Sequence, residues 1–350
     1  MSRKPQTTLR RGWTTGACAT AATKAALLQL WGDEAPGKVH IVLPRGERPE
    51  FEVAFRDSGE GWAEAGIVKD AGDDPDVTHG ALIKSRVSMS DAGVKFRAGE
   101  GVGTVTMSGL PVPPGEPAIN PVPRQMMVGT VNEVAARFGR PPNVIIRISV
   151  PGGEEIARNT WNSRLGIRGG LSILGTTGIV RPFSCAAWIA SIHRGIDVAR
   201  AEGLRHVAGC TGATSEKSVQ NLHGLPDEAM LDMGDFAGGM LKYLARHPVP
   251  RITVGGGIGK MAKLAQGAMD LHSGRSRVDM GQLAHATGNS EIADLNSVMR
   301  AYEVEGGALA DWIAENSLAN IRAMLPESVF VDTVVVDRQG TVLSMAGMKE

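Results

Sequence analysis

Short hydrophobic runs alternate with Gly, Pro and Asp along the first half of the chain, and this pattern predicts strands separated by turns. An alanine-rich stretch over residues 17–31 comes first and predicts a helix, with Thr15 as its N-cap. A second helix is expected over residues 125–138. The expected strands cover residues 39–43, 50–55, 63–68, 84–89, 103–107 and 144–150. This half of the chain is therefore predicted to be an α+β region.

The pattern changes at about Gly169, where short apolar strands begin to alternate with helices, as is typical of a mainly parallel sheet. Strands are expected at residues 171–174, 206–208, 251–254 and 329–336, and helices at residues 184–202, 227–246 and in several segments of 260–324. One of these helices carries an apolar stripe that predicts core packing rather than a cofactor surface; its residues are Met230, Leu231, Phe236, Met240, Leu241 and Leu244. We expect two domains, an α+β domain over residues 1–160 and an α/β domain over residues 161–350.

The composition is that of a folded protein without a general affinity for nucleic acid. Of the 350 residues, 42% are hydrophobic, and 37 Lys plus Arg balance 37 Asp plus Glu, which leaves no excess positive charge to neutralise phosphates. No apolar run approaches the roughly 20 residues that span a bilayer. The cysteines Cys18, Cys185 and Cys210 show no zinc spacing and no disulfide framework. We expect a cytoplasmic protein without a bound metal, in which Cys18 and Cys210 are small buried residues.

Glycine is unusually frequent, with 45 residues, and three expected strands end in glycine-rich turns. Carboxyl ends of parallel strands form a ligand crevice, so these turns are predicted to converge on one rim and bind a nucleotide-like cofactor; the alternative is that the glycines merely close tight turns. The Walker A and dinucleotide patterns both fail, which leaves an adenosine cofactor without a pyrophosphate. The candidate cofactor-binding residues are Gly175, Thr176, Thr177, Gly178, Gly209, Thr211, Gly212, Gly255, Gly256, Gly257 and Gly259.

Four carboxylates lie within seven residues at Asp70, Asp73, Asp74 and Asp76. Mutual repulsion is expected to raise their pKa values and could create a general base or a cation site, although not an EF-hand. The alternative is a solvated turn with Asx caps.

Two further segments could recognise carboxylates. The proline-rich residues 115–124 form a rigid loop that could present Asn120 and Arg124, or could be a structural crossover. The run of Arg and Asn over residues 158–168 suits a polyanionic substrate, because guanidinium groups bind carboxylates in bidentate geometry. A solvated linker would show the same composition.

Taken together, six segments resemble the cobalt-precorrin-5B C1-methyltransferase family of anaerobic-type cobalamin biosynthesis. They are Gly12-Trp13-Thr14-Thr15-Gly16-Ala17-Cys18 and residues 69–78, 99–104, 115–124, 159–162 and 165–180. The resemblance implies an N-terminal domain like ribosomal S5 domain 2 and a C-terminal Rossmann-like domain. It also implies S-adenosylmethionine as methyl donor and C1 of a cobalt corrinoid as acceptor, with cobalt-precorrin-6A as product and the cobalt belonging to the substrate.

This resemblance gives the candidate residues their expected roles. Asp70 and Asp73 become candidates for accepting a proton or orienting the substrate. The expected substrate-binding residues are Thr14, Thr15, Lys69, Asn120, Arg124, Asn162, Arg164 and Arg168. We expect cobalt-precorrin-5B as a partner, no nucleic acid and no membrane, and leave a homo-oligomer open. The alternatives are a nucleotide-dependent small-molecule enzyme and a noncatalytic corrinoid carrier.

Overall fold

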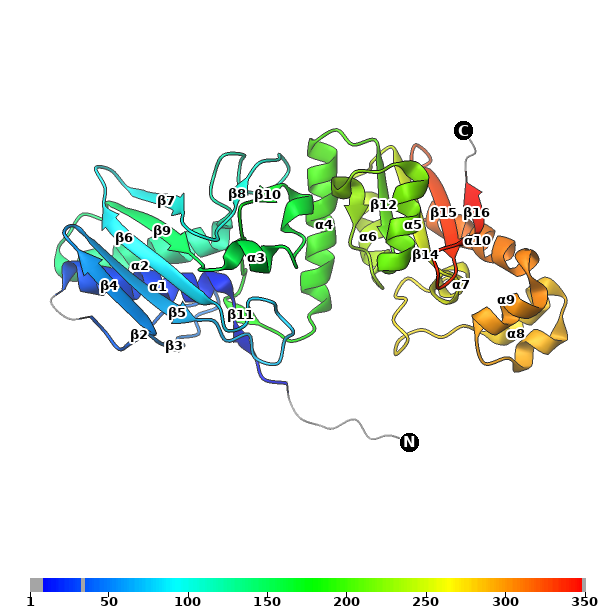
Figure 1. Ribbon diagram of the computed structural model, residues 1–350, viewed down its shortest axis with the longest axis horizontal. Coiled ribbons are helices and arrows are strands. Elements are labelled where there is room, and N and C mark those ends of the chain that lie inside the picture. Colours follow the sequence, from blue (N-terminus) through cyan, green and yellow to red (C-terminus); the bar gives the residue numbers. More distant parts are fainter. Residues whose placement is uncertain (1–8, 33–34, 348–350) are drawn as a thin grey trace. The chain divides into compact units, whose positions relative to one another are not determined.

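The computed structural model describes residues 9–32 and 35–347 (Figure 1). It divides into two compact units, with the division between Ser184 and Cys185, whereas the sequence pattern placed a boundary at 160/161. The later position arises because segments after residue 160 pair with early strands. β11 (Ile179–Val180) is antiparallel to β1 (Gly12–Trp13), and β10 (Ile167–Arg168) to β8 (Thr104–Val105). The fold is mixed α and β.

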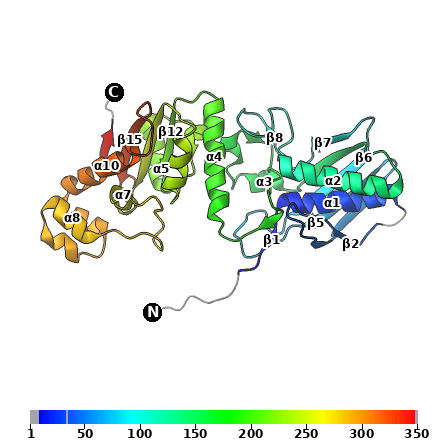
Figure 2. The same ribbon diagram turned by 180° about the vertical axis from the view of Figure 1, so that it is seen from behind.

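The first unit is built on a five-stranded sheet in the order β4-β5-β6-β9-β7, in which β7 and β9 are parallel and the other pairs antiparallel. Helices α1 (Thr15–Trp31) and α2 (Pro121–Phe138) lie side by side on one of its faces (Figure 2). The strands are β4 (Phe55–Gly59), β5 (Trp62–Val68), β6 (Leu82–Met89), β7 (Val94–Ala98) and β9 (Val144–Ser149); smaller elements are β2 (Lys38–His40), β3 (Glu50–Glu52), α3 (Gly153–Ala157) and a 3-10 turn at Asn162–Leu165.

Small side chains explain how α1 packs against the sheet. Its buried positions are mainly Ala, together with Cys18, Thr20 and Thr23, so the helix backbone approaches β5 and β6 closely. The Thr23 hydroxyl lies 2.8 Å from that of Ser85 on β6. Alternate strand residues such as Ile146 and Ile148 on β9 complete this core, which leaves the opposite face of the sheet to polar side chains.

The second unit contains a sheet in the order β13-β12-β14-β15-β16, in which only the last pair is antiparallel. Helix α5 packs on one face with Val219, while α4, α6, α7 and α10 cover the other. The elements are β12 (His206–Cys210), β13 (Met230–Leu231), β14 (Arg251–Gly257), β15 (Phe330–Val336), β16 (Val342–Gly347), α4 (Cys185–Ala201), α5 (Ala213–His223), α6 (Ala237–Leu244), α7 (Ile258–Ala265), α8 (Met280–Thr287), α9 (Val298–Glu305), α10 (Gly307–Arg322) and 3-10 turns at Asp227–Ala229 and Ser290–Asp294.

Two expected elements are wrong. Residues 171–174 form isolated bridges to Val102 and Ile119 in the first unit rather than a strand of the parallel sheet. Residues 227–246 are not one helix, because Met230 and Leu231 pair with β12, and α6 begins only at Ala237. Strands β4, β7 and β16 were not anticipated. No helix in the described ranges combines the length and apolar character needed to cross a membrane.

Candidate functional site

The acidic loop ties down the N-terminal segment through Asp70 and Asp73. The guanidinium of Arg10 donates to both carboxylate oxygens of Asp70, with the Nη2–Oδ1 distance 2.9 Å, and the backbone N–H of Arg10 donates to Asp73 Oδ2 at 2.6 Å. The hydrogen bond from Arg10, with the backbone N–H of Gly72, lowers the pKa of Asp70 to about 2. The expectation of a raised pKa is wrong for this residue, which is an ionised and weakly basic carboxylate at neutral pH.

The other end of the loop is organised by a buried lysine. The Lys69 side chain is 2% exposed, forms an ion pair with Asp76 and donates to the Thr78 hydroxyl. Burial alone would raise the pKa of Asp76, but the Lys69 ammonium and Thr78 outweigh it and the pKa falls, again against expectation. Asp74 accepts from the backbone N–H of Phe183 at 2.8 Å. The Lys69 ammonium therefore points into the loop rather than to the solvent.

Thr14 and Thr15 are buried at the start of α1, and both hydroxyls are used within the protein. The Thr14 hydroxyl accepts from the backbone N–H of Ala17 at 3.2 Å, so Thr14 is the N-cap in place of the expected Thr15. Thr15 Oγ1 donates to the Leu174 carbonyl and accepts from the Leu174 N–H, each at 3.1 Å. These bonds fasten the segment that precedes Gly175 to the N-terminus of α1.

The first glycine-rich turn therefore lies beside α1 and not at the rim of the parallel sheet. A Cβ on Gly175 would come within 2.3 Å of Thr14 Oγ1, and the Gly178 carbonyl accepts from the Thr14 N–H at 3.0 Å. Thr177 caps the following strand by accepting from the Ile179 N–H, whereas Thr176 is exposed. The predicted convergence of three turns on one sheet rim is wrong, because residues 171–174 belong to no strand of that sheet.

The proline-rich loop uses Arg124 internally and leaves Asn120 available. The Arg124 guanidinium donates to Glu116 Oε2 at 3.2 Å, to the Pro117 carbonyl at 3.0 Å and to the Ile119 carbonyl at 2.8 Å. Asn120 begins α2 without a side-chain capping bond and is half-buried. Within residues 9–32 and 35–347 its side chain makes no hydrogen bond, so Asn120 is the better ligand candidate of the two.

Only part of the arginine-rich run over residues 158–168 lies at the protein surface, where a ligand could reach it. Asn162 is buried, donating to the Gly170 carbonyl at 3.2 Å and accepting from the Ser172 hydroxyl at 3.3 Å. The Arg164 guanidinium stacks over the Trp161 ring at 4.2 Å. Arg168, on β10, is exposed. The structure brings these residues into the first unit along with the acidic loop and the Gly175 turn.

The other two glycine-rich segments meet at the carboxyl rim of the second unit's sheet. The adjacent strands β12 and β14 lead into the N-termini of α5 and α7, with Gly212 and Gly257 as the residues that precede the helices. Lys260 Nζ lies 2.8 Å from Asp235 Oδ1 and donates to the Thr211 carbonyl at 3.1 Å. Strand order reverses at β12 and β14, the position where open α/β sheets bind ligands.

The rim glycines fall into two groups. A Cβ on Gly209 would meet Met240 Sδ at 2.4 Å, one on Gly255 the Val219 side chain at 2.5 Å, and one on Gly256 the Thr211 side chain at 2.8 Å. These three glycines serve internal packing. A Cβ on any of the other three glycines would meet no heavy atom within 4 Å, so a ligand has space to approach the protein backbone there. These glycines are Gly212, Gly257 and Gly259.

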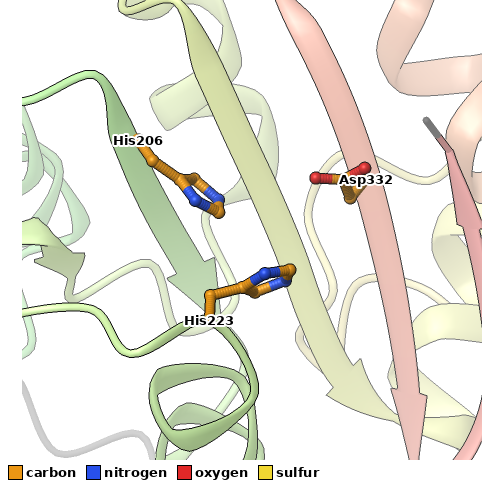
Figure 3. Close-up of side chains that lie close together, drawn as sticks. All are labelled: His206, His223 and Asp332. Carbon is orange, nitrogen blue, oxygen red and sulfur yellow. The ribbon is translucent and has the colours of Figure 1, made fainter. Parts of the chain in front are cut away.

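A polar cluster that the sequence analysis missed lies between the same sheet and α5. Figure 3 shows His206, His223 and Asp332 pointing toward one another. Their ligand atoms lie within 4.8 Å of one another, a grouping that could hold a metal ion. The Thr253 hydroxyl links them, 2.8 Å from His206 Nε2 and 3.4 Å from both His223 Nε2 and Asp332 Oδ2, while Arg251 donates to Asp332 at 2.6 Å. The arrangement is a hydrogen-bonded network in this structure.

A family model described as CbiD matches residues 2–182. The chain belongs to the CbiD family. A relative from Paramagnetospirillum magneticum, named cobalt-precorrin-5B C(1)-methyltransferase, is 58% identical over 97% of this chain and 98% of its own length. Relatives of the same name from Brucella canis and Brucella anthropi are 56% and 57% identical, each over 96% of this chain and 95% of their own length. A crystal structure titled cobalamin biosynthesis protein (cbiD) from Archaeoglobus fulgidus is 26% identical with a TM-score of 0.42, covering 85% of each chain.

The signal for the missed cluster in this CbiD protein was the presence of polar residues inside apolar strands. Thr253 and Asp332 are buried within the apolar strands β14 and β15, and His206 is the first residue of β12. Only strand pairing places them together, because they are far apart in sequence. Cys18 and Cys210 are buried as expected, and burial raises the pKa of the Cys18 thiol to about 12, which makes it unsuited to nucleophilic catalysis.

Proposed function

We propose that this chain transfers a methyl group from S-adenosylmethionine to C1 of cobalt-precorrin-5B and so forms cobalt-precorrin-6A in cobalamin biosynthesis. The observation that carries the proposal is the 58% identity, over 97% of the chain, with a protein named for this methyl transfer. Identity at this level over almost the whole length covers both units and every segment that the sequence analysis singled out.

The second unit is proposed to be a Rossmann-like domain that holds the methyl donor at its carboxyl rim. Helices cover both faces of a largely parallel sheet whose order reverses between β12 and β14. Gly212, Gly257 and Gly259 leave open space beside two helix N-termini. Those termini carry partial positive charge and suit the carboxylate of the methionine tail. The residues present fit an adenosine ligand without phosphates. Cofactor binding by Gly175 to Gly178 stays a prediction apart from this rim, because these residues lie in the first unit.

When bound, S-adenosylmethionine supplies an electrophilic methyl group, whose bond to sulfur breaks with the electron pair on sulfur while the acceptor carbon provides the pair for the new bond. The protein's part is to align donor and acceptor and to exclude water. The macrocycle must also lose one proton. The Arg10 guanidinium occupies both carboxylate oxygens of Asp70, so Asp73, which is exposed, is the better candidate for assisting this step.

Asp73→Asn tests that assignment while preserving the fold. The amide oxygen can still accept from the Arg10 N–H, so only the negative charge is lost. We expect turnover to fall by about a hundredfold or more, as for other general acid–base groups, with donor affinity unchanged. Asp91→Asn, at another exposed aspartate, is the matched control. Turnover equal to that of the unmodified protein would remove Asp73 from the mechanism.

The decisive experiment incubates the protein with S-adenosylmethionine labelled in the methyl group and cobalt-precorrin-5B. Label is expected in the macrocycle at C1. Binding of the corrinoid without label transfer would support a noncatalytic carrier instead. Dependence on ATP rather than S-adenosylmethionine would support the nucleotide-dependent enzyme.

A further inference from the structure

Three arginines lie in register across adjacent strands on the open face of the first unit's sheet. Arg86 on β6 is directly opposite Arg147 on β9, and Arg147 is directly opposite Arg97 on β7. Neighbouring strands are about 4.8 Å apart, so the row extends over roughly 10 Å. The face is not the one covered by α1 and α2, because the intervening residues Ile146 and Ile148 point into that core.

This row is poorly neutralised. Glu64 on β5 is the carboxylate beside it, and it is shared at 3.2 Å between Arg86 and Lys84. Arg147 and Arg97 are exposed and form no ion pair within the described part of the chain. Like charges directly opposite one another on neighbouring strands destabilise a sheet. Binding of an anion by the row would explain why the protein keeps arginines that lower the stability of the sheet.

The row forms one side of a depression with an aromatic wall. A cavity of about 270 Å³ is lined by Trp62, Arg86, Ser88, Arg97, Ile145 and Arg147. The Arg86 guanidinium lies 3.9 Å from the centre of the Trp62 ring, which holds both side chains in place. The site therefore combines forked donors for carboxylates with a planar guanidinium–indole stack.

We propose that this basic face is a docking site for a carboxylate-rich tetrapyrrole, the ring lying against the Arg86–Trp62 stack and its peripheral carboxylates on Arg97 and Arg147. The assignment rests on the proposed function for its choice of ligand. A macrocycle bordered by carboxylates matches a row of guanidinium groups beside an indole. The zero net charge of the chain makes a nucleic acid the poorer match.

The test measures binding of an octacarboxylate porphyrin, uroporphyrin, to the full chain by its absorbance shift and by calorimetry. Each of Arg97→Gln and Arg147→Gln is expected to weaken binding by about tenfold, and the double variant by about a hundredfold. Arg140→Gln removes an exposed arginine from the same unit beyond the end of α2 and should bind normally. Equal affinity in the double variant and the unmodified protein would overturn the proposal.

Thermal stability separates a binding role from a structural one. Without ligand, Arg147→Gln should raise the melting temperature, because it relieves repulsion from both neighbouring arginines, while Arg140→Gln should leave it unchanged. A lower melting temperature for Arg147→Gln would show that the row stabilises the sheet. Competition by inositol hexakisphosphate at the same concentration as uroporphyrin would show a general polyanion site and would also overturn the assignment.

The methyl-transfer assay keeps this inference distinct from the proposed function. If the enzyme methylates cobalt-precorrin-5B, the double variant should raise KM for the corrinoid about a hundredfold with kcat preserved. An unchanged KM would overturn the docking site while leaving the methyltransferase intact. If no methyl transfer occurs but uroporphyrin binding still depends on Arg97 and Arg147, the docking site stands and the proposed activity fails.

Discussion

At the scale of single residues, glycines at the second unit's rim do different work although they are adjacent in sequence. Gly255 and Gly256 allow strand β14 to pack against the Val219 and Thr211 side chains, whereas a Cβ on Gly257 would meet nothing within 4 Å. The sequence motif alone does not separate a packing glycine from one that admits a ligand. The difference is set by what lies opposite each Cα.

A pair of valine substitutions tests this distinction. Gly257→Val should reduce S-adenosylmethionine affinity by tenfold or more, about 1.4 kcal/mol, because the side chain would occupy the space of the approaching cofactor. Its melting temperature should be retained. Gly255→Val should lower the melting temperature instead, since its Cβ would meet Val219 at 2.5 Å. Calorimetric titration that gives unchanged affinity for a folded Gly257→Val would refute the cofactor placement.

A second residue-scale prediction concerns pH. Burial, with the nearby His223 and Arg251, lowers the pKa of His206 from 6.5 to about 4. Below pH 6.5 the unfolded chain therefore binds a proton that the folded chain does not, so stability from neutral His206 is complete above pH 6.5 and is lost progressively toward pH 4. In urea unfolding, His206→Gln should lose less stability than the unmodified protein between about pH 7.5 and about pH 5. The exposed His285→Gln is the control, and identical pH dependence for all three proteins would contradict this origin.

At the scale of elements, the acidic loop holds two other segments of the chain in place by hydrogen bonds. Its side chains hold Arg10 and the backbone of Phe183, and its interior is filled by the Lys69–Asp76 ion pair. A segment rich in aspartate looks from its composition like a solvated turn or a cation site. In the fold Asp70, Asp73 and Asp74 bind Arg10 and the backbone of Phe183 from distant parts of the chain, and Asp76 binds Lys69 within the loop.

Removing the buried lysine measures this role. Lys69→Met should destabilise the first unit by about 3 kcal/mol, because it leaves the Asp76 carboxylate without its cation in a mostly buried site. Adding Asp76→Asn should recover part of the loss. Lys38→Met breaks the exposed pair with Glu50 and should change stability little. A normal unfolding free energy together with a raised substrate KM for Lys69→Met would instead favour direct contact with the substrate.

At the scale of the whole molecule, the hydrophobic cores separate along the chain. One core is built from residues between Ala17 and Ile173, and the other from residues between Ile192 and Val335. Each unit therefore has enough buried apolar surface for its own cooperative transition. The methyl donor is proposed to bind the second unit and the corrinoid the first.

Scanning calorimetry should then show two unfolding transitions that respond to different ligands. S-adenosylmethionine at a hundred times its dissociation constant should stabilise the second unit by about 2.7 kcal/mol and leave the other transition in place. Uroporphyrin should raise the midpoint temperature of the first unit's transition. If both ligands raised the midpoint temperature of one shared transition equally, this would contradict independent unfolding of the two units.

Much of the regular structure is predictable because it depends on local patterns. The alanine-rich α1, the strands β5, β12 and β15, and the glycines at the end of β14 follow from side-chain periodicity and turn residues. Periodicity predicts the wrong element where strand pairing determines the structure. Met230 and Leu231 are apolar enough for a helix but pair with β12. At β7 the signal was present but was not used, because Val94, Phe96 and Ala98 alternate with Lys95 and Arg97 in the period-two pattern of a half-buried strand.

The sequence by itself determined the family, the α and β content, the buried cysteines and the glycine-rich segments, because these depend on residue identity and local order. Tertiary structure alone decided which charges meet. It paired Asp70 with Arg10 and Asp76 with Lys69, which lowers the pKa of both carboxylates. It also left three arginines facing one another on β6, β9 and β7. Electrostatic energies depend on distance and burial in space, and neither can be obtained from separation along the chain.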